Sequence, residues 1–405
     1  MSNLFGVLAE KKPLQYLLKP LTSVRYLGGV AFASLLLAGC SNAPVAQWPW
    51  VLSPSVVPSG QPVPTQPPTY PSYPPQTGGN PSFPPRMNPQ INYPPPAQGR
   101  GDYMTYPAMR SFISKMNRVH GFNLAFLEQT FAGVQRDSEV LVKAGAPAEG
   151  QPWRAYRPIF LTEERIRGGV DFWHRNQAIL DNTARQYGVD PEYMVAIIGV
   201  ETQYGKNTGK HNVLRALTTL GFDYSRRSDF YQRELEQFLL LAREEGVQPQ
   251  IFTGSYAGAM GLGQFIPSSY RSYALDGNRD RKRDLWNPLD AIPSVANYFA
   301  RNGWVRGGGV AVPAYVSGSS YARLAETSAK KPSRSMAELL SNGVRPQAAL
   351  NSARVSLLKL EGTGSDEYWV GGDNFYVITR YNPNVKYAMA VHQLAQAIRQ
   401  RKLGY

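Results

Sequence analysis

The sequence predicts an α+β fold that is mainly helical, with a helical core and a smaller β-rich part. Most of the chain from residue 107 onward places its apolar residues at helical spacing. Between about 305 and 380 this spacing gives way to short apolar runs separated by glycines, which are typical of strands. Near the end, Tyr387, Val391, Leu394 and Ile398 recur at i, i+4, i+7 and i+11, so we expect a helix to return and pack on the core.

Composition excludes several classes of function. The 405 residues allow two or three domains, and the formal net charge is +14. A single cysteine excludes a disulfide framework, a zinc ribbon and a CxxC redox centre. Four histidines without an HExxH pattern argue against a metallohydrolase. Of the 33 prolines, 18 lie within residues 41–106, so a head, a proline-rich tether and a body must be considered separately.

The head, residues 1–39, is predicted to be a lipoprotein signal peptide. Four bases precede an apolar run over residues 26–38, which is short for an uncleaved membrane span. The run ends in Leu37-Ala38-Gly39-Cys40, which resembles the bacterial lipobox, whose cysteine is acylated and becomes the first residue of the mature protein. Ser41 resembles the sorting signal for the outer membrane. We expect acyl chains such as palmitate on Cys40 to anchor the protein at the periplasmic face of the outer membrane. The alternative is that Cys40 is a buried free cysteine, but no segment next to it in the sequence could bury it.

Acylated Cys40 and the residues up to 106 are predicted to form the tether. Pairs of prolines favour extended polyproline II, and few long aliphatic residues are available for a core. Tyr70, Tyr73 and Tyr93 are interleaved with these prolines and are consistent with a second interpretation, a docking segment for a partner.

The body is predicted to contain several helices and a few strands, taken in chain order. Helical spacing covers residues 107–145, 161–187, 190–202, 228–245 and 288–302. Strands are predicted at Arg354–Leu360, Tyr368–Val370 and Phe375–Thr379.

The helix at 190–202 carries a carboxylate on its apolar side. Asp190 is the expected N-cap, Pro191 the first helical residue, and Glu192 belongs to the first turn. Glu201 follows Ile198, Ile197 and Met194 at i−3, i−4 and i−7, so its carboxylate is expected on the buried stripe. Burial raises the pKa of a carboxylic acid toward the range of a general acid. A structural Glu201 paired with Lys206 explains the same pattern, and periodicity does not decide between the two.

A glycine-rich stretch follows some fifty residues later. It contains Gly254, Gly258, Gly261 and Gly263, which permit the backbone to approach a ligand closely. Ser255 and Gln264 add hydrogen-bonding groups, and Phe265 is one of three rings that suit the faces of sugars. The stretch lacks the Gly-Lys-Ser/Thr ending of a phosphate loop.

Three separated motifs together resemble the lytic murein transglycosylases. They are Glu201-Thr-Gln-Tyr-Gly205, Gly258-Ala-Met-Gly-Leu-Gly-Gln-Phe-Ile-Pro-Ser268 and Asn374-Phe-Tyr-Val-Ile-Thr-Arg-Tyr-Asn382. The resemblance implies a goose-lysozyme-like core flanked by an α domain and a β domain. The implied boundaries are an α domain at 107–187 joined by the helix 384–403, a catalytic core at 188–304 and a β-rich domain at 305–383.

The resemblance also assigns roles to single residues. Glu201 falls on the catalytic acid, and Ser255 and Gln264 fall on residues that contact this acid or the substrate. Arg226 and Arg227 match a pair that lines the groove near the peptide stems. Aromatic residues near the cleft are matched by Tyr156, Tyr298, Tyr376 and Tyr381.

The family is a carbon–oxygen lyase of peptidoglycan, and the motifs are consistent with its chemistry. It cleaves the MurNAc–GlcNAc β-1,4 bond without water and leaves 1,6-anhydromuramoyl ends. Ordinary glycoside hydrolases use two carboxylates, but neither core motif contains a second Asp or Glu. We therefore expect Glu201 to act alone as acid and then base, with no cofactor required. The alternatives are a hydrolytic muramidase, for which Asp223 and Asp284 are poor second acids, and a lipoprotein that only binds peptidoglycan.

A polar loop at 276–290 resembles the opening of an EF-hand. Asp276, Asn278 and Asp280 occupy positions 1, 3 and 5, and Lys282 occupies position 7. Arg281 replaces the glycine of position 6 and Asn287 the glutamate of position 12, so the ordinary loop is incomplete. The resemblance implies a longer loop whose last carboxylate is Asp290. The sequence thus predicts a structural Ca²⁺, and a polar turn before the helix at Pro288 is the alternative.

The basic body is expected to bind an anionic polymer. Residues 107–405 carry +10 of the net charge, which alone is compatible with nucleic acid. Because a lipoprotein signal places the chain outside the cytoplasm, we expect the charge to attract peptidoglycan and exclude nucleic acid as a partner. Cell-wall synthesis or division proteins are the other partners that this location suggests.

Overall fold

The computed structural model describes residues 102–145 and 150–404. The predicted signal peptide, Cys40 and the tether up to residue 101 lie outside the described residues. The body begins earlier than the sequence predicts, because Asp102–Thr105 forms a short 3-10 helix, η1. Tyr103 is fully buried there and donates a hydrogen bond to Asp223 Oδ2 at 2.6 Å.

Three of the first six α-helices precede the gap at residues 146–149, and three follow it. Glycine ends α1 and α6 with a left-handed backbone conformation, and Asn123 and Thr162 cap α2 and α5 with their side chains. The predicted helical range 107–145 is therefore divided at Gly121 and Asn123, and the range 161–187 is divided at Asn176, between α5 and α6. The bounds are α1 Pro107–His120, α2 Leu124–Ala132, α3 Ser138–Gly145, α4 Trp153–Phe160, α5 Glu163–Arg175 and α6 Gln177–Tyr187.

Helix α7, Pro191–Thr202, is buried on every side. It begins where the sequence predicts, but the Asp190 side chain makes no capping hydrogen bond. Every residue from Glu192 to Thr202 is buried. The further elements of this region are β1 His211–Asn212, α8 Val213–Asp223, η3 Ser225–Arg227, α9 Ser228–Glu244, η4 Pro249–Ile251, β2 Thr253–Gly254, α10 Pro267–Tyr273 and α11 Pro288–Arg301.

A five-stranded sheet occupies the predicted β-rich region, with strand order β4-β6-β7-β3-β5. All neighbouring pairs are antiparallel except β4 with β6. Side chains of this region form a small hydrophobic core that is separate from the main core of the protein. It includes Leu339, Val344, Leu357 and Val370. The bounds are β3 Ala311–Val316, η5 Ser320–Leu324, β4 Ala325–Glu326, α12 Met336–Ser341, β5 Val344–Pro346, β6 Ser356–Glu361 and β7 Asp366–Gly371.

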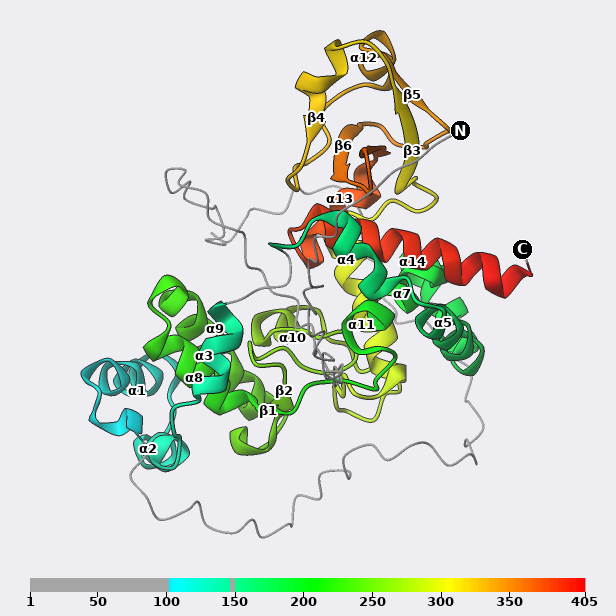
Figure 1. Cartoon of the computed structure of the whole chain (residues 1–405). Coiled ribbons are helices and arrows are strands. Elements are labelled where there is room, and N and C mark those ends of the chain that lie inside the picture. The colour runs from blue at the N-terminus through cyan, green and yellow to red at the C-terminus, as the bar shows by residue number, and fades with distance from the viewer. Residues whose placement is uncertain (1–101, 146–149, 405) are drawn as a thin grey trace, which may run out of the picture. The chain divides into compact units, whose positions relative to one another are not determined.

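The prediction of a strand at Phe375–Thr379 is wrong, because these residues lie in helix α13, Asp373–Tyr381. The run has β-forming residues, but Phe375 and Ile378 are three positions apart and both are buried, which fits a helix. The predicted terminal helix is present as α14, Val385–Leu403, which contacts α4, α5, α7 and α13 (Figure 1). In the part of the chain that the structure describes, no helix is long and apolar enough to cross a membrane.

Candidate active site

Glu201 lies in the last turn of α7 and is 3% exposed. Its Oε1 accepts a hydrogen bond of 2.5 Å from the hydroxyl of Tyr387, which α14 brings across from a position 186 residues later. Burial, followed by the nearby charge of Glu201, raises the pKa of Tyr387 well above its ordinary range. The phenol therefore stays protonated and remains a donor to this carboxylate.

The chain reverses sharply after Thr202, the last residue of α7, and Thr202 itself contacts the glycine-rich loop. Gln203 and Tyr204 have positive φ angles of 50° and 62°, and Gly205 has 92°. The hydroxyl of Thr202 lies 3.1 Å from the carbonyl oxygen of Leu262 in that loop and donates to it, so the two predicted motifs are in direct contact.

The glycine-rich loop is held by hydrogen bonds within the protein. Ser255 is fully buried, and its hydroxyl oxygen accepts from the backbone amides of Ala257 and Ala259 at 3.2 and 3.0 Å. Against expectation, the close neighbours of the glycines are parts of the protein: a side chain at Gly258 would meet Leu217, and one at Gly261 would meet Leu285.

Gln264 is the residue of this loop whose hydrogen bonding is incomplete. It is 2% exposed, and its amide nitrogen donates to the carbonyl oxygens of Thr208 and Gly261 at 3.1 and 2.9 Å. Its Oε1 has no hydrogen-bond partner in the structure. A buried acceptor of this kind is costly, which is consistent with a group that a ligand completes.

Most of the predicted aromatic residues pack behind the site. Phe265, Tyr381 and Tyr156 are 2%, 6% and 1% exposed. Whether the Phe265 ring presents its face to a sugar stays a prediction. Tyr298 packs between Phe265 and Tyr381, with ring centroids at 5.9 and 4.8 Å, and donates to the carbonyl oxygen of Arg380. These rings form one cluster with Tyr381, whose hydroxyl donates to Gly263 O at 2.5 Å.

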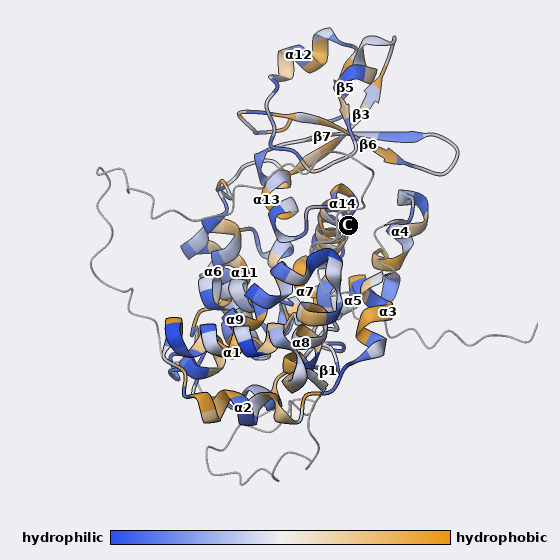
Figure 2. Ribbon diagram, turned by 90° about the vertical axis from the view of Figure 1, so that its left-hand side faces the viewer, coloured by the Kyte–Doolittle hydropathy of each residue, from blue (hydrophilic) through white to orange (hydrophobic). Residues whose placement is uncertain are grey.

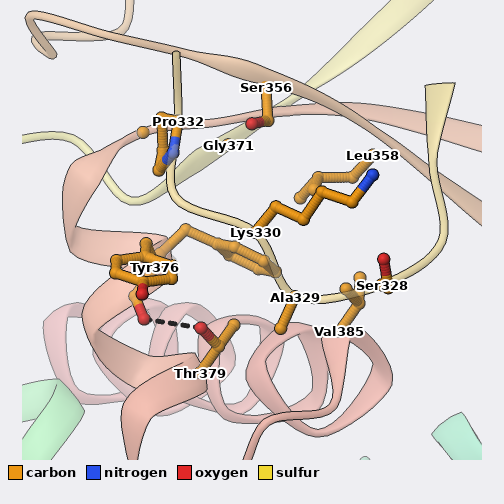
Figure 3. Close-up of a pocket in the computed structure, with 12 residues that line it drawn as sticks. Ser328, Ala329, Lys330, Pro332, Ser356, Leu358, Gly371, Tyr376, Thr379 and Val385 are labelled. Atoms are coloured by element: carbon orange, nitrogen blue, oxygen red, sulfur yellow. Dashed lines mark hydrogen bonds between the residues drawn. The ribbon is translucent and has the colours of Figure 1, made fainter. Parts of the chain in front are cut away.

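Tyr376 lies apart from that cluster, on α13. It is half-buried and lines a small pocket together with residues of β6, β7 and the segment that precedes α12. Figure 3 shows Tyr376, Thr379 and Lys330 around this pocket, with the Thr379 hydroxyl bonded to the carbonyl oxygen of Tyr376 at 2.6 Å.

The two predicted groove arginines lie on η3, between α8 and α9. Arg226 is exposed. The guanidinium of Arg227 lies 4.1 Å from the ring centroid of Phe230. Whether the two arginines line the same groove as Glu201 stays a prediction.

The residues considered in the alternative interpretations of the site, Lys206, Asp223 and Asp284, have other partners in the structure. Lys206, the expected partner of a structural Glu201, pairs with Glu164 at 2.8 Å. Asp223 accepts from Tyr103 and pairs with Arg136. Asp284 accepts from the backbone amide of Trp286.

Buried acids elsewhere have similar partners. Glu192 pairs with Arg399 at 3.0 Å. Glu234 accepts from the amide and hydroxyl of Ser268 at the start of α10. A phenol as hydrogen-bond donor distinguishes Glu201 from these two.

The loop at 276–290 has the internal hydrogen bonds of a cation-binding turn. Asp276 accepts from the amides of Asp280 and Arg281 at 3.0 and 2.8 Å, and Asp280 accepts from the amide of Lys282 at 2.9 Å. Fully buried Asp290 accepts from the amides of Gly277, Asn278 and Asp284. Burial raises its pKa to about 7. A donor set of carboxylate and amide oxygens fits Ca²⁺.

A second group of potential metal ligands is satisfied by cations of the protein. Within the described ranges, Asp137, Glu139 and His211 bring ligand atoms within 4.8 Å of one another. Lys143 lies 2.7 Å from Glu139 and 3.0 Å from His211 Nε2, and Arg215 lies 2.7 Å from Asp137. We interpret this group as a charge-balanced network.

Tyr387 is the site residue that the sequence analysis missed. It was assigned to the apolar stripe of the terminal helix, and it is indeed buried. The available signal was its hydroxyl, because a buried tyrosine normally needs a hydrogen-bond partner. Periodicity alone does not identify that partner.

Comparisons with known proteins agree with this geometry. A family model described as the transglycosylase SLT domain matches residues 105–396. Membrane-bound lytic murein transglycosylase B of Escherichia coli (strain K12) is 43% identical over 310 residues, which cover 74% of this chain and 84% of that protein.

Two solved structures are similar over their full lengths. The catenated lytic transglycosylase SltB1 from Pseudomonas aeruginosa is 46% identical, covers 74% of this chain and has a TM-score of 0.71. The Escherichia coli lytic transglycosylase Slt35 in complex with calcium is 41% identical, covers 78% of this chain and has a TM-score of 0.70. The fold class is confirmed as α+β, mainly α and lysozyme-like. Over most of its length, therefore, this chain belongs to the lytic murein transglycosylases, the enzymes that cleave peptidoglycan.

Proposed function

We propose that this enzyme cleaves the β-1,4 bond between MurNAc and GlcNAc without water and leaves a 1,6-anhydromuramoyl end. The observation that supports this most is the buried Glu201 carboxyl, which accepts a hydrogen bond from Tyr387. Asp223 and Asp284, the two acids considered for a hydrolytic mechanism, are engaged by other groups. One carboxylate is sufficient if the substrate itself supplies the nucleophile.

Glu201 acts twice in this mechanism. It first protonates the glycosidic oxygen as that bond breaks, because burial favours the neutral form of a carboxyl group. The N-acetyl carbonyl oxygen of MurNAc stabilises the positive charge that develops at C1. Ionised Glu201, stabilised by the hydrogen bond from Tyr387, then removes the proton of the C6 hydroxyl, and O6 bonds to C1. Glu201 ends protonated, and no water is consumed.

Replacing Glu201 by Gln tests this mechanism. The amide has the same shape but cannot deliver a proton, so anhydro ends should fall by at least about a thousandfold, while folding and binding to sacculi persist. Mass spectrometry of digested peptidoglycan measures the ends. Substantial anhydro product from the Glu201→Gln protein contradicts the single-acid mechanism. Reducing ends from the wild type indicate a muramidase, and no new ends indicate binding alone.

We further propose that the loop at 276–290 binds a structural Ca²⁺. Asp276, Asn278, Asp280 and Asp290 would supply side-chain oxygens, and Lys282 its backbone carbonyl. The hydrogen bonds from backbone amides to Asp276, Asp280 and Asp290 support this, because they pre-orient the carboxylates. The related Slt35 structure in complex with calcium is consistent with it. The chemistry assigned to Glu201 does not depend on this ion.

The location is also a proposal. Cys40 ends a lipobox-like sequence, and the Escherichia coli relative is called membrane-bound. We infer a lipid anchor at the periplasmic face of the outer membrane, with peptidoglycan as the polymer that the basic body attracts.

A further inference from the structure

A groove of about 310 Å³ lies between the turn that joins α1 to α2 and the C-terminal end of α9. It lies on other elements than those that carry Glu201 and Tyr387. We name it the α2 groove. Its apolar and aromatic lining residues are Phe122, Phe126, Leu239, Val247 and Pro249.

Two nearly parallel phenyl rings and one guanidinium group line one part of the α2 groove. Phe122 and Phe126 stack with their centroids 6.2 Å apart and their planes at 15°. Arg243 lies over Phe122 at 4.2 Å and donates to the carbonyl oxygen of His120 at 2.7 Å, which fixes its position. Phe122 is 5% exposed and lies beneath Arg243, so half-buried Phe126 and the exposed Arg243 guanidinium offer the flat surfaces against which proline rings pack in polyproline recognition.

The surroundings of the groove are apolar and also offer donors. Val119 and Leu124, on either side of the α1–α2 turn, are 58% and 47% exposed. Figure 2 shows hydrophobic residues on α2. Asn123 and Gln248 line the groove, and their amide groups bring N–H donors, which match the free carbonyl oxygens of a polyproline helix.

The start of the described chain places a proline-rich segment within reach. Helix η1 contacts both α1 and α2, and Tyr103 is fully buried. Tyr93-Pro94-Pro95-Pro96 precedes Asp102 by only a few residues. Six residues of extended chain span about 19 Å, whereas α2, with nine residues, is about 13 Å long.

We propose that Tyr93-Pro94-Pro95-Pro96 of this same chain docks in the α2 groove. Attachment through a short connection gives the segment an effective concentration of about 1 mM, which favours it over a second copy of the protein. Docking would bind the last part of the tether to the body and leave only the residues before it as free spacer.

Hydrogen exchange of the full chain in detergent, followed by mass spectrometry, tests the proposal. The signal is the exchange of peptides covering 121–132 and 242–251. With a Kd of about 0.1 mM, docking should slow exchange there about tenfold. The variant P94A/P95A/P96A should lose this protection. The matched control P67A/P68A, a proline pair farther from the body, should keep it.

Two further experiments test whether the occupant of the α2 groove is this segment or a second copy of the protein. A synthetic peptide of residues 90–100 should restore protection to the P94A/P95A/P96A protein, and the same peptide with three alanines should not. Phe126→Ala, at a half-buried position, should abolish both effects. Equal exchange in the wild type and P94A/P95A/P96A overturns the proposal. Protection that depends on protein concentration but not on these prolines also overturns it, because a second copy is then the occupant.

Discussion

At the scale of single residues, the proposed catalytic geometry depends on the contact between Tyr387 and Glu201. Tyr387 is buried, and its hydroxyl lies 2.5 Å from Glu201 Oε1. A neutral phenol orients a carboxyl group without adding a charge. It also donates to the ionised form that remains after the glycosidic oxygen has been protonated. We therefore assign Tyr387 as a positioning residue for Glu201.

Replacing Tyr387 by Phe should lower kcat by about 10- to 100-fold, because a misplaced acid loses alignment with the glycosidic oxygen. KM should change little if the buried phenol acts only through its contact with Glu201. Steady-state release of soluble muropeptides measures both constants. Tyr193→Phe is the matched control, because Tyr193 is also buried between α7 and α14 but bonds to His392. Equal losses in both variants would identify a packing effect.

The burial of Glu201 could be predicted from the sequence, and the surroundings of the aromatic residues could not. Glu201 follows two isoleucines at three and four positions, in a segment that begins with the helix-start signals Asp190 and Pro191. Phe265 and Tyr376 occur in equally distinctive motifs, but their exposure depends on which helix covers them. Periodicity within one segment carries no information about a neighbour such as α14.

At the scale of helices and strands, His392 of α14 contacts three other elements, α7, β3 and β7. The hydroxyl of Tyr193 on α7 lies 2.9 Å from its Nδ1, and the ring also makes a hydrogen bond to the backbone of Ala311 at the start of β3. Trp369 of β7 packs edge-on against it, with centroids at 6.0 Å. Burial lowers the pKa of His392 to about 4, so the neutral ring is the form that connects α14 to these elements.

This low pKa predicts a loss of stability in acid. The unfolded state takes up a proton near pH 6.5 and the folded state only near 4, so stability is full above 6.5 and falls as the pH drops toward 4. Between pH 7 and 5 the free energy of unfolding should fall by about 2 kcal/mol from this group. Urea titrations at several pH values measure the slope.

Two variants identify the source of that slope. His392→Gln should flatten the pH dependence, whatever its effect on stability at pH 7. Exposed His174→Gln should leave the wild-type slope unchanged. A slope retained in His392→Gln would assign the acid sensitivity to other groups, such as Glu244, whose pKa is lowered by its hydrogen bond with Arg271 and which therefore also stabilises the fold less in acid.

The calcium loop gives a second prediction at this scale. Ca²⁺ at a hundredfold excess over Kd should stabilise the folded state by about 2.7 kcal/mol, a shift of a few degrees in Tm. Asp276→Ala should remove the shift, whereas Asp284→Ala, in the same loop but outside the proposed ligands, should keep it. An unchanged wild-type melting curve in millimolar Ca²⁺ would argue against the site. Chelator should reduce cleavage only near the melting range.

Element prediction succeeded where an amphipathic pattern or a helix-start signal such as Asp190-Pro191 was present, and it failed where the residue types favoured a strand. Helices α7, α9, α11 and α14 match their predicted segments. The residue types of Phe375–Thr379 favour a strand. The sequence does not show that Gly372, directly before this helix, donates a backbone hydrogen bond to Val310. The sequence analysis does not predict helix α8, which is largely buried like α7 but lacks the Asp-Pro start that marks α7.

At the scale of the whole molecule, Cys40 is expected to determine where the enzyme works. Cys40→Ala should release the protein into the periplasm, because each acyl chain contributes about 0.8 kcal/mol per buried CH₂. Its activity on isolated sacculi should be unchanged, since the described site lies wholly after residue 101. Membrane fractionation with the Ser41→Ala protein as control measures this. A Cys40→Ala protein that still sediments with outer-membrane vesicles would contradict the lipid anchor.

The contact between Glu201 and Tyr387 also sets the time at which the enzyme becomes competent. The acid precedes its partner by 186 residues along the chain. A ribosome must therefore synthesise all of these residues after Glu201 before the contact can form. A nascent or prematurely terminated chain that lacks Tyr387 carries the acid without this hydrogen-bond donor.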